Sequence, residues 1–351
     1  MHEPLLADFA AGKQAALARA ISIVENRRGG FEELLAAWHS RLGHARRIGI
    51  TGPPGAGKST LTTGLTRAFR AQGLTVGIIA VDPTSPFTGG ALLGDRIRME
   101  DVALDPGVYI RSLATRGSLG GLSAATRETC DVLDAFGIDR ILIETVGVGQ
   151  SELDVARTAD TSLVVLVPES GDAIQTLKAG LMEIADIFTV NKADRPGADR
   201  LRNEIEIMLG MRGGATMRNV PAHHGVDLSQ NNILKQVRAA AATDDTTHWT
   251  PPVLRTVAVK DEGITELMAA LDRHFRYLEE SGTLRERRRT RLRDRVVEVV
   301  EAKVRHRLWS DADTNKWLED RLADLETGAA TPFGIANDLL ARSVDLLTRT
   351  S

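Results

Sequence analysis

Apolar residues occur in short continuous runs from about residue 46 to residue 278, and helix-like segments separate most of these runs. A run that is apolar at both odd and even positions is typical of a strand buried on both faces. We expect strands at 46–51, 75–81, 107–113, 139–145, 161–167, 186–191 and 253–259. Helical periodicity lies between them, as at 58–70, 124–136 and 263–277. This order predicts an α/β fold with a mostly parallel sheet that helices cover on both faces.

The chain on either side of this α/β domain has a different pattern. Residues 1–45 predict an N-terminal helical arm, in which 1–28 should form one or two amphipathic helices. Residues 279–351 predict a C-terminal helical region. Within the domain, 211–250 contains glycine, asparagine and proline with little periodicity, so we expect an irregular insertion with a short helix near 233–242. The α/β domain itself is therefore predicted to span 46–278.

Composition and net charge limit the kinds of protein that this chain can be. The chain has 351 residues, of which 42% are hydrophobic and 26% charged, as is usual for globular proteins. A net charge of -3 gives no electrostatic reason to expect nucleic acid or an anionic membrane as a partner. Cys130 is the only cysteine, which excludes an intramolecular disulfide and a multi-cysteine metal site. No apolar run could span a bilayer and no signal peptide is evident, so we expect a cytoplasmic protein.

Two local features allow more than one interpretation. The basic run at 285–295 could indicate RNA binding, but acidic residues are interleaved with it, which favours a solvated or dimer-forming helix. Further C-terminal helices are expected at 312–326 and 333–349. His223 and His224 are adjacent within the insertion and could be metal ligands, although neighbouring histidines without further ligands are more typical of a loop.

A phosphate-binding loop follows the first predicted strand. The sequence GPPGAGKST (52–60) matches G-x-x-x-x-G-K-[ST] and lies between a strand and a helix, as this motif requires. Small residues let the backbone N–H groups surround phosphate oxygens, while the lysine supplies a cation and the hydroxyl that follows it can ligate Mg²⁺. The expected nucleotide contacts are Gly55, Ala56, Gly57, Lys58, Ser59 and Thr60.

An acidic residue ends the fourth predicted strand. Glu144 follows the apolar residues ILI and precedes the glycine-spaced sequence VGVG. Alone, it could be a strand-end carboxylate that reaches solvent. Next to a phosphate-binding loop it can instead hold Mg²⁺, which offsets the cost of burying its charge.

The nucleotide base is predicted from a third motif. Asn191, Lys192 and Asp194 form an N-K-x-D sequence at the end of a predicted strand. The aspartate of this motif accepts two N–H groups from guanine that adenine cannot offer together, so GTP is expected rather than ATP. Ala258 lies where a backbone contact to the base is expected, whereas Val257 stands at a position usually occupied by serine, so no hydroxyl contribution is expected there.

These motifs and the longer blocks around them resemble the MeaB-type GTPases, also labelled ArgK or LAO/AO transport kinases, the group of the methylmalonic aciduria type A protein. The resemblance spans nearly all of 20–275. It implies a P-loop NTPase fold of the SIMIBI or G3E class, with C-terminal helices that form a homodimer. The matching blocks are ISIVEN, TGPPGAGKST, VDPTSPFTGGALLGDRIRM, YIRSLATRGSLGGLS, ETVGVGQSE, EIADIFTVNKAD and WTPPVLRTVAVKDEGI.

The resemblance also implies roles for single residues. Arg98 would contact the nucleotide, and Gln175 and Lys178 would belong to a switch segment, although Lys178 could equally be a solvated helix residue. Asp82 and Asp95 would belong to a segment that senses the γ-phosphate and Mg²⁺, a phosphate sensor, although each could instead cap a turn or a helix. The implied catalytic set is Lys58, Asp95 and Glu144. The implied magnesium set is Ser59, Asp82, Asp95, Glu144 and Thr145.

The resemblance implies a GTPase that acts as a chaperone of an adenosylcobalamin-dependent acyl-CoA mutase, gating cofactor loading and protecting the mutase. The client would be methylmalonyl-CoA mutase or a relative, such as isobutyryl- or 2-hydroxyisobutyryl-CoA mutase. No Asp-x-x-Gly-Gln arrangement positions the attacking water, so we expect slow hydrolysis that a partner accelerates. Two alternatives remain open at this stage: a small-metabolite kinase, and a nickel-insertion GTPase.

Overall fold

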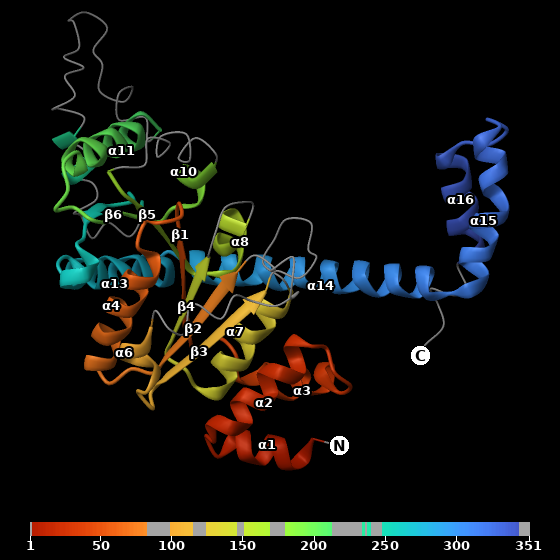
Figure 1. The fold of residues 1–351 in the computed structure, drawn as a ribbon, viewed down its shortest axis with the longest axis horizontal. Coiled ribbons are helices and arrows are strands. Elements are labelled where there is room, and N and C mark those ends of the chain that lie inside the picture. Colours follow the sequence, from red (N-terminus) through yellow and green to blue (C-terminus); the bar gives the residue numbers. More distant parts are fainter. Residues whose placement is uncertain are drawn as a thin grey trace, which may run out of the picture. The chain divides into compact units, whose positions relative to one another are not determined.

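The computed structural model describes residues 2–82, 99–114, 124–145, 151–168, 180–212, 234–235, 237–239 and 248–343. The chain divides into two compact units, residues 1–285 and residues 286–351. The first unit is built on a seven-stranded sheet and contains both nucleotide motifs (Figure 1). The second unit is helical.

The sheet has the strand order β3-β2-β4-β1-β5-β6-β7, and its neighbouring strands are all paired in parallel. The predicted α/β fold with a parallel sheet is therefore confirmed. The strands are β1 (Arg46–Thr51), β2 (Val76–Asp82), β3 (Val108–Ala114), β4 (Arg140–Thr145), β5 (Thr161–Leu166), β6 (Ile187–Val190) and β7 (Val253–Arg255).

The last strand is shorter than the predicted segment 253–259, which was wrong beyond Arg255. The apolar pattern continues, but Val257 leaves the sheet and its N–H donates to the carbonyl of Glu262 at 3.0 Å. Between them the chain forms a 3₁₀ turn, η3 (Ala258–Lys260), and Asp261 takes a left-handed conformation with φ of 57°. A tight turn thus replaces the end of the strand, and it brings the backbone of 256–258 back toward β6.

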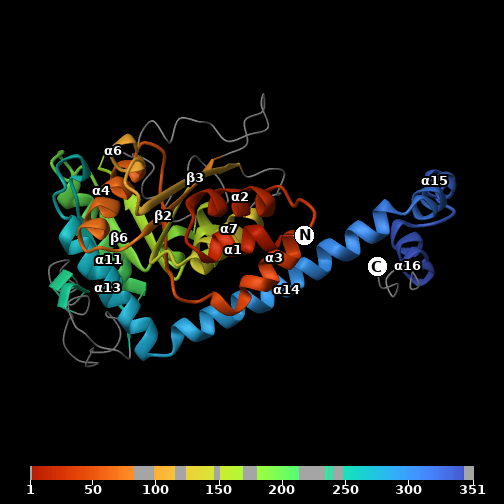
Figure 2. The same cartoon turned by 90° about the horizontal axis from the view of Figure 1, so that it is seen from below.

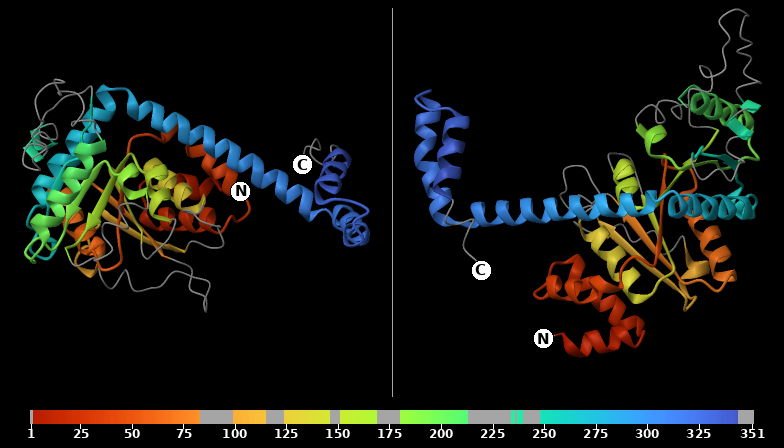
Figure 3. Two further views of the ribbon diagram at one scale, coloured as in Figure 1. Left: turned by 90° about the horizontal axis from the view of Figure 1, so that it is seen from above. Right: turned by 180° about the vertical axis from the view of Figure 1, so that it is seen from behind.

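Helices cover both faces of the sheet because each strand presents apolar residues on both sides (Figures 1 and 3). In β4, Ile141 and Ile143 pack with the helices on one face, and Leu142 packs with those on the other. Alternation of side-chain direction along a strand produces this division. The first face is covered by α7 (Ala124–Phe136) and α8 (Ser151–Thr158), and the second by α4 (Lys58–Ala71), α6 (Glu100–Ala103) and α13 (Ile264–Glu280). The β5–β6 end also packs against α10 (Met182–Ile184) and α11 (Ala198–Arg212).

The N-terminal segment forms three helices: α1 (Glu3–Ala10), α2 (Gln14–Glu25) and α3 (Phe31–Trp38), followed by the 3₁₀ turn η1 (His39–Arg41). The first two lie within 1–28, where one or two helices are predicted, so that prediction is confirmed. A left-handed glycine, Gly30 with φ of 86°, separates the last two helices. The three helices lie beside α7 and share one apolar cluster with it (Figures 1 and 2). Phe9 stacks on Trp38 with ring centroids 4.2 Å apart and meets the edge of Phe136 at 5.0 Å.

One buried carboxylate joins these helices to the sheet. Asp134 of α7 accepts the backbone N–H groups of Gly43, His44 and Ala45 at 2.9, 3.0 and 2.9 Å. It also accepts a hydrogen bond from the guanidinium of Arg47 at 3.2 Å. The chain therefore enters β1 at a fixed position.

The second unit contains most of α14 (Thr283–Ser310), α15 (Ala312–Glu326) and α16 (Pro332–Arg342). Asp311 caps α15 by accepting the N–H of Thr314 at 2.8 Å, and Thr331 caps α16 by accepting that of Gly334 at 3.1 Å. The prediction of a helix at 312–326 is confirmed. The predicted 333–349 helix is present as α16 but ends at Arg342, with Ser343 as its C-cap. No helix in the described part of the chain is both long and apolar enough to cross a membrane.

Candidate functional site

The loop between β1 and α4 has the backbone of a phosphate cradle. Gly52, Gly55 and Gly57 have φ values of 139°, 76° and 85°, which side chains disfavour. A Cβ at Gly52 would lie 2.0 Å from the carbonyl oxygen of Val165, and one at Gly57 would lie 2.4 Å from the side-chain amide of Asn191. Glycine is thus favoured at both ends of the loop, because the backbone of β5 approaches Gly52 and the side chain of Asn191 approaches Gly57.

Lys58 begins α4 and is almost completely buried, at 6% exposure. Its Nζ donates to the carbonyl oxygens of Gly52 and Pro53 at 2.8 and 3.1 Å. The side chain of Lys58 is therefore folded back over the loop, and the two carbonyl oxygens hold its ammonium group there. A cation in this position can interact with phosphate oxygens that enter the cradle.

The carboxyl ends of β1 and β4 bring the acidic motif to the loop. Glu144 lies beside Ile50 in the sheet register and is 1% exposed. Its carboxylate accepts the hydroxyl of Ser59 at 2.6 Å and that of Thr62 at 3.0 Å. The next residue, Thr145, donates its hydroxyl to that of Thr51 at 3.2 Å. Three predicted site residues, Ser59, Glu144 and Thr145, are thus close together.

Thr62 was not predicted. It lies three residues after Ser59 on the same face of α4, and this spacing was the available signal. Its hydroxyl oxygen also lies 2.9 Å from the carbonyl oxygen of Lys58, so its single O–H proton is shared between that carbonyl and Glu144. The two hydroxyls together satisfy both oxygens of the buried carboxylate.

Asp82 is the last residue of β2, whose neighbour in the sheet is β4. Parallel strands end at the same edge of a sheet, so its backbone reaches the carboxyl edge at which Glu144 lies. The other predicted residues of the phosphate sensor and switch lie outside the described residues, as do the two adjacent histidines. They are Asp95, Arg98, Gln175, Lys178, His223 and His224.

Asn191 connects the phosphate loop to the base motif. It follows β6, is 2% exposed, and its amide Nδ2 donates to the carbonyl of Ala56 at 2.8 Å. Its Oδ1 accepts the N–H of Ala258 at 3.1 Å and the hydroxyl of Thr256 at 3.2 Å. A single buried amide therefore fixes two loops that are about 200 residues apart in the chain.

Thr256, one residue before Val257, supplies a hydroxyl that was not predicted. It donates to the side-chain oxygen of Asn191 at 3.2 Å. β7 ends at Arg255, and the tight turn that follows directs Thr256 inward, where it is 1% exposed.

Of the remaining base-motif residues, Lys192 is half-buried and Asp194 is exposed. Lys192 takes a left-handed conformation with φ of 55°, and the N–H of Ala193 donates to the carbonyl of Thr256 at 3.0 Å. Asp194 has a side chain that is 44% exposed, and its carboxylate lies 4.0 Å from the ammonium of Lys260. The carboxylate is thus accessible to a ligand and already close to a cation from η3.

The fold and these loops define the class: a P-loop nucleotide-binding protein with the guanine-reading sequence. The model of the family "Methylmalonyl Co-A mutase-associated GTPase MeaB" matches residues 17–313. The chain therefore belongs to the MeaB family of P-loop GTPases.

Individual relatives agree with this assignment. The chain is 48% identical over 289 residues to a putative GTPase of Pyrococcus horikoshii, covering 82% of each chain. It is 31% identical to the mitochondrial methylmalonic aciduria type A homolog of Mus musculus, covering 95% of this chain and 77% of the relative. A crystal structure of a LAO/AO transport system kinase has a TM-score of 0.65 and 26% identity, with 97% and 96% of the two chains covered.

The predicted family is confirmed, and with it the prediction that the chain is a GTPase that binds guanine nucleotide. The comparisons do not favour the alternatives of a metabolite kinase or a nickel-insertion GTPase, because the family model and the names of its sequence relatives describe GTPases.

Proposed function

We propose that this GTPase acts as a chaperone of an adenosylcobalamin-dependent acyl-CoA mutase. In this proposal its nucleotide state gates cofactor loading and protects the mutase. The observation that carries the proposal is the match of residues 17–313 to a family described as mutase-associated. The proposed client is methylmalonyl-CoA mutase or a relative such as isobutyryl- or 2-hydroxyisobutyryl-CoA mutase.

The proposed nucleotide site combines the phosphate loop, Lys58 and the base motif. Lys58 and the backbone N–H groups of the loop would stabilise charge on the transferring phosphoryl group. Asp194 would accept the guanine N–H groups, and Ala258 would contact the base through its backbone. Asn191 holds both loops in place through its contacts with Ala56 and Ala258.

The residues near Glu144 fit a magnesium ion. A buried carboxylate 2.6 Å from the Ser59 hydroxyl offers the hard oxygen donors that Mg²⁺ prefers. We propose Ser59, Asp82, Asp95, Glu144 and Thr145 as the residues that hold it, directly or through water. When bound, the ion would neutralise charge on the β- and γ-phosphate oxygens. Glu144 and Ser59 are already oriented toward each other and would need little rearrangement.

Nucleotide binding tests the first part of the proposal. Replacing Asp194 with asparagine removes a charged acceptor, and such hydrogen bonds contribute about 1.5–3 kcal/mol, so GDP affinity should fall roughly ten- to a hundredfold. Asp313→Asn is a matched control on an exposed residue of the second unit. Titration with a fluorescent GDP analogue in the presence of magnesium provides the measurement. Equal affinities of the two variants would contradict the assigned base site.

Coupling to the mutase tests the second part. Single-turnover GTP hydrolysis should be slow for the isolated protein and faster when a purified client mutase is added. Lys58→Ala should abolish both rates. Tight GTP binding with a rate that no cobalamin-dependent mutase changes would leave the GTPase assignment intact and remove the client.

A further inference from the structure

Helix α4 carries three buried threonines behind the phosphate loop, Thr62, Thr63 and Thr66. The hydroxyl of each lies within hydrogen-bond distance of the carbonyl oxygen four residues earlier, at 2.9, 2.9 and 2.8 Å. Among the described residues, only Thr62 also reaches a carboxylate. Its Oγ1 lies 3.0 Å from Oε2 of Glu144. One of three similar hydroxyls is thus placed at the proposed metal site.

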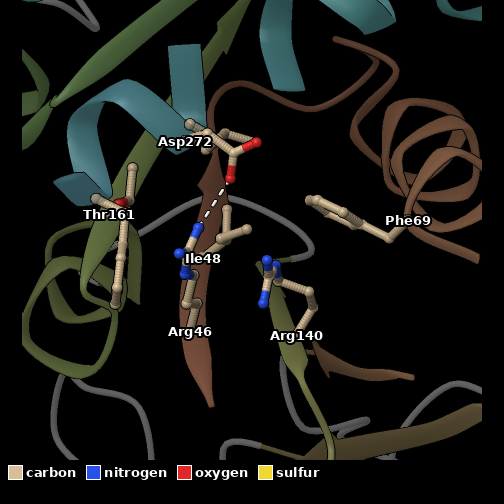
Figure 4. Close-up of a pocket in the computed structure, with 8 residues that line it drawn as sticks. Arg46, Ile48, Phe69, Arg140, Thr161 and Asp272 are labelled. Carbon is tan, nitrogen blue, oxygen red and sulfur yellow. Dashed lines mark hydrogen bonds and ion pairs between the residues drawn. The ribbon is translucent and has the colours of Figure 1, made fainter. Parts of the chain in front are cut away.

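Contacts at both ends of β4 join this strand to α4. Arg140 begins β4 and lies over the ring of Phe69, with its guanidinium carbon 5.5 Å from the ring centroid. Figure 4 shows this ring directed toward the arginine. Leu142 packs with apolar residues of α4 in one cluster, and Glu144 near the end of the strand meets Thr62. These contacts fix the position of the helix along the strand, and with it the distance between the hydroxyl and the carboxylate.

The helix backbone also selects the rotamer of Thr62. Threonine in a helix divides between two χ1 rotamers, because its Oγ1 can bond a carbonyl of the preceding turn. The 2.9 Å contact with the carbonyl of Lys58 shows that Thr62 has the bonding rotamer, and this rotamer also places Oγ1 beside Glu144. The carboxylate is the stronger acceptor of the single O–H proton, because hydrogen bonds to charged groups are stronger than those to a neutral carbonyl.

The two oxygens of Glu144 have different partners. Oε1 lies 2.6 Å from the hydroxyl of Ser59, and Oε2 lies 3.0 Å from that of Thr62, one turn farther along α4. The carboxylate belongs to a residue that is 1% exposed, so solvent offers no replacement for either hydroxyl. Rotation of the carboxylate about its last bond would exchange the two oxygens. Thr62 opposes this rotation because it holds Oε2.

We propose that Thr62 is a positioning residue of the magnesium site: its hydroxyl holds Oε2 of Glu144 so that Oε1 faces Ser59. This inference rests on the proposed magnesium set, to which Ser59 and Glu144 belong. Outer-shell hydrogen bonds orient the groups that hold a metal, and their loss typically lowers metal affinity by about ten- to a hundredfold. Because Ser59 and Thr62 lie on one helix, a single rigid element orients both the hydroxyl and the carboxylate.

The magnesium dependence of nucleotide release tests this role in the full-length protein. A fluorescent GDP analogue is bound and then displaced by excess GDP, in EDTA and over a series of magnesium concentrations. Thr62→Val keeps the shape of the side chain and removes its hydroxyl. We expect the magnesium concentration that gives half-maximal slowing of release to rise about tenfold. Release in EDTA should stay at the wild-type rate, because the loss acts only through Glu144 and the ion.

Thr66→Val is the matched control. Its hydroxyl is equally buried and, among the described residues, bonds only the carbonyl of Thr62. The substitution removes the same group from the same helix, so a loss of helix stability alone would appear in both variants. The magnesium response of Thr66→Val should equal that of the wild type. Thr62→Ser keeps the hydroxyl and should restore most of the response, whereas Glu144→Gln should shift it at least as far as Thr62→Val does.

Three results would overturn the proposal. One is an unchanged magnesium response in Thr62→Val beside a shifted response in Glu144→Gln. Another is an equal shift in Thr62→Val and Thr66→Val. The third is faster release of the analogue from Thr62→Val in EDTA by the same factor as in magnesium, which would place the defect in the phosphate loop.

Failure of the proposed magnesium site gives a different result. A Glu144→Gln variant with the wild-type magnesium response would remove that site, and this inference with it. The release measurements involve no mutase, so the proposed client stands or falls separately.

Discussion

At the scale of single residues, several charged or polar side chains are buried only because a partner from a distant segment satisfies them. Glu144 accepts the Ser59 and Thr62 hydroxyls, and Asn191 connects the backbones of Ala56 and Ala258. Arg47 shows the same balance. Burial disfavours the charged guanidinium and lowers its pKa. The negative charges around it, of which the Asp131 carboxylate has the largest effect and those of Asp134 and Asp160 smaller ones, more than compensate, so the pKa of Arg47 is raised. Such residues stabilise one arrangement of loops and are costly in any other.

Among these buried charged and polar side chains, Asp134 should contribute most to the free energy of unfolding. Asp134→Ala would leave three backbone N–H groups and Arg47 without their acceptor, and breaking a buried pair costs about 3–5 kcal/mol. Urea unfolding should show this loss in the free energy of unfolding. Asp131→Ala removes the other, more exposed carboxylate paired with Arg47 and should cost less than half as much. Similar losses in both variants would contradict the proposed role of the backbone contacts.

At the scale of elements, the N-terminal helices belong to the core of the first unit. Their apolar residues pack with α7 in one cluster, and Arg111 of β3 forms an ion pair with Glu25 of α2. From the sequence alone, these helices are predicted to form an arm outside the α/β domain, because they precede its first strand. Amphipathic periodicity does not reveal which surface the apolar face will contact. The three helices cover a face of α7 that would otherwise be exposed.

Phe9 tests this packing. It is 1% exposed between Trp38 and Phe136, and replacement of a buried phenylalanine with alanine costs about 3–5 kcal/mol. We expect Phe9→Ala to lower the free energy of unfolding by that amount in a urea titration monitored by tryptophan fluorescence. Phe333→Ala, at a residue that is 84% exposed, should change it by less than about 0.5 kcal/mol. An arm that unfolds separately would appear instead as an early transition with the main transition unchanged.

At the scale of the whole molecule, the second unit carries apolar side chains that the described chain leaves exposed. On α14, Val296 and Val300 are 63% and 53% exposed. The other exposed large apolar residues of this helix are Leu292, Val297, Val299, Val304 and Trp309. An exposed apolar surface of this kind marks an interaction site. We propose that it contributes to a homodimer, as the family resemblance implies.

The dimer can be tested without disturbing the nucleotide site. The wild type should have the mass of a dimer in size-exclusion chromatography with light scattering, and the double variant Val296→Asp/Val300→Asp should have that of a monomer. Glu301→Lys, on an exposed residue of the same helix, is the control and should remain dimeric. GDP affinity should be the same in all three proteins. A double variant that stays dimeric would exclude this face as the interface.

The sequence alone allows the sheet strands, most helices and the phosphate loop to be predicted, because each depends on local periodicity or on a contiguous motif. It also allows Glu144 and the N-K-x-D residues to be placed at strand ends, since parallel strands end at one edge. Local patterns fail where a turn interrupts them: the apolar run after Arg255 continues, but the chain leaves the sheet.

Only the tertiary structure decides which distant groups meet. The pairing of Thr62 with Glu144, of Thr256 with Asn191, and of Asp134 with the segment before β1 depends on strand order and helix packing. Arg46 and Arg140 are nearly a hundred positions apart in the chain, and only the pairing of β1 with β4 makes them neighbours at the amino edge of the sheet. A motif specifies the chemistry of its own residues, whereas burial and charge balance depend on partners that the fold alone supplies.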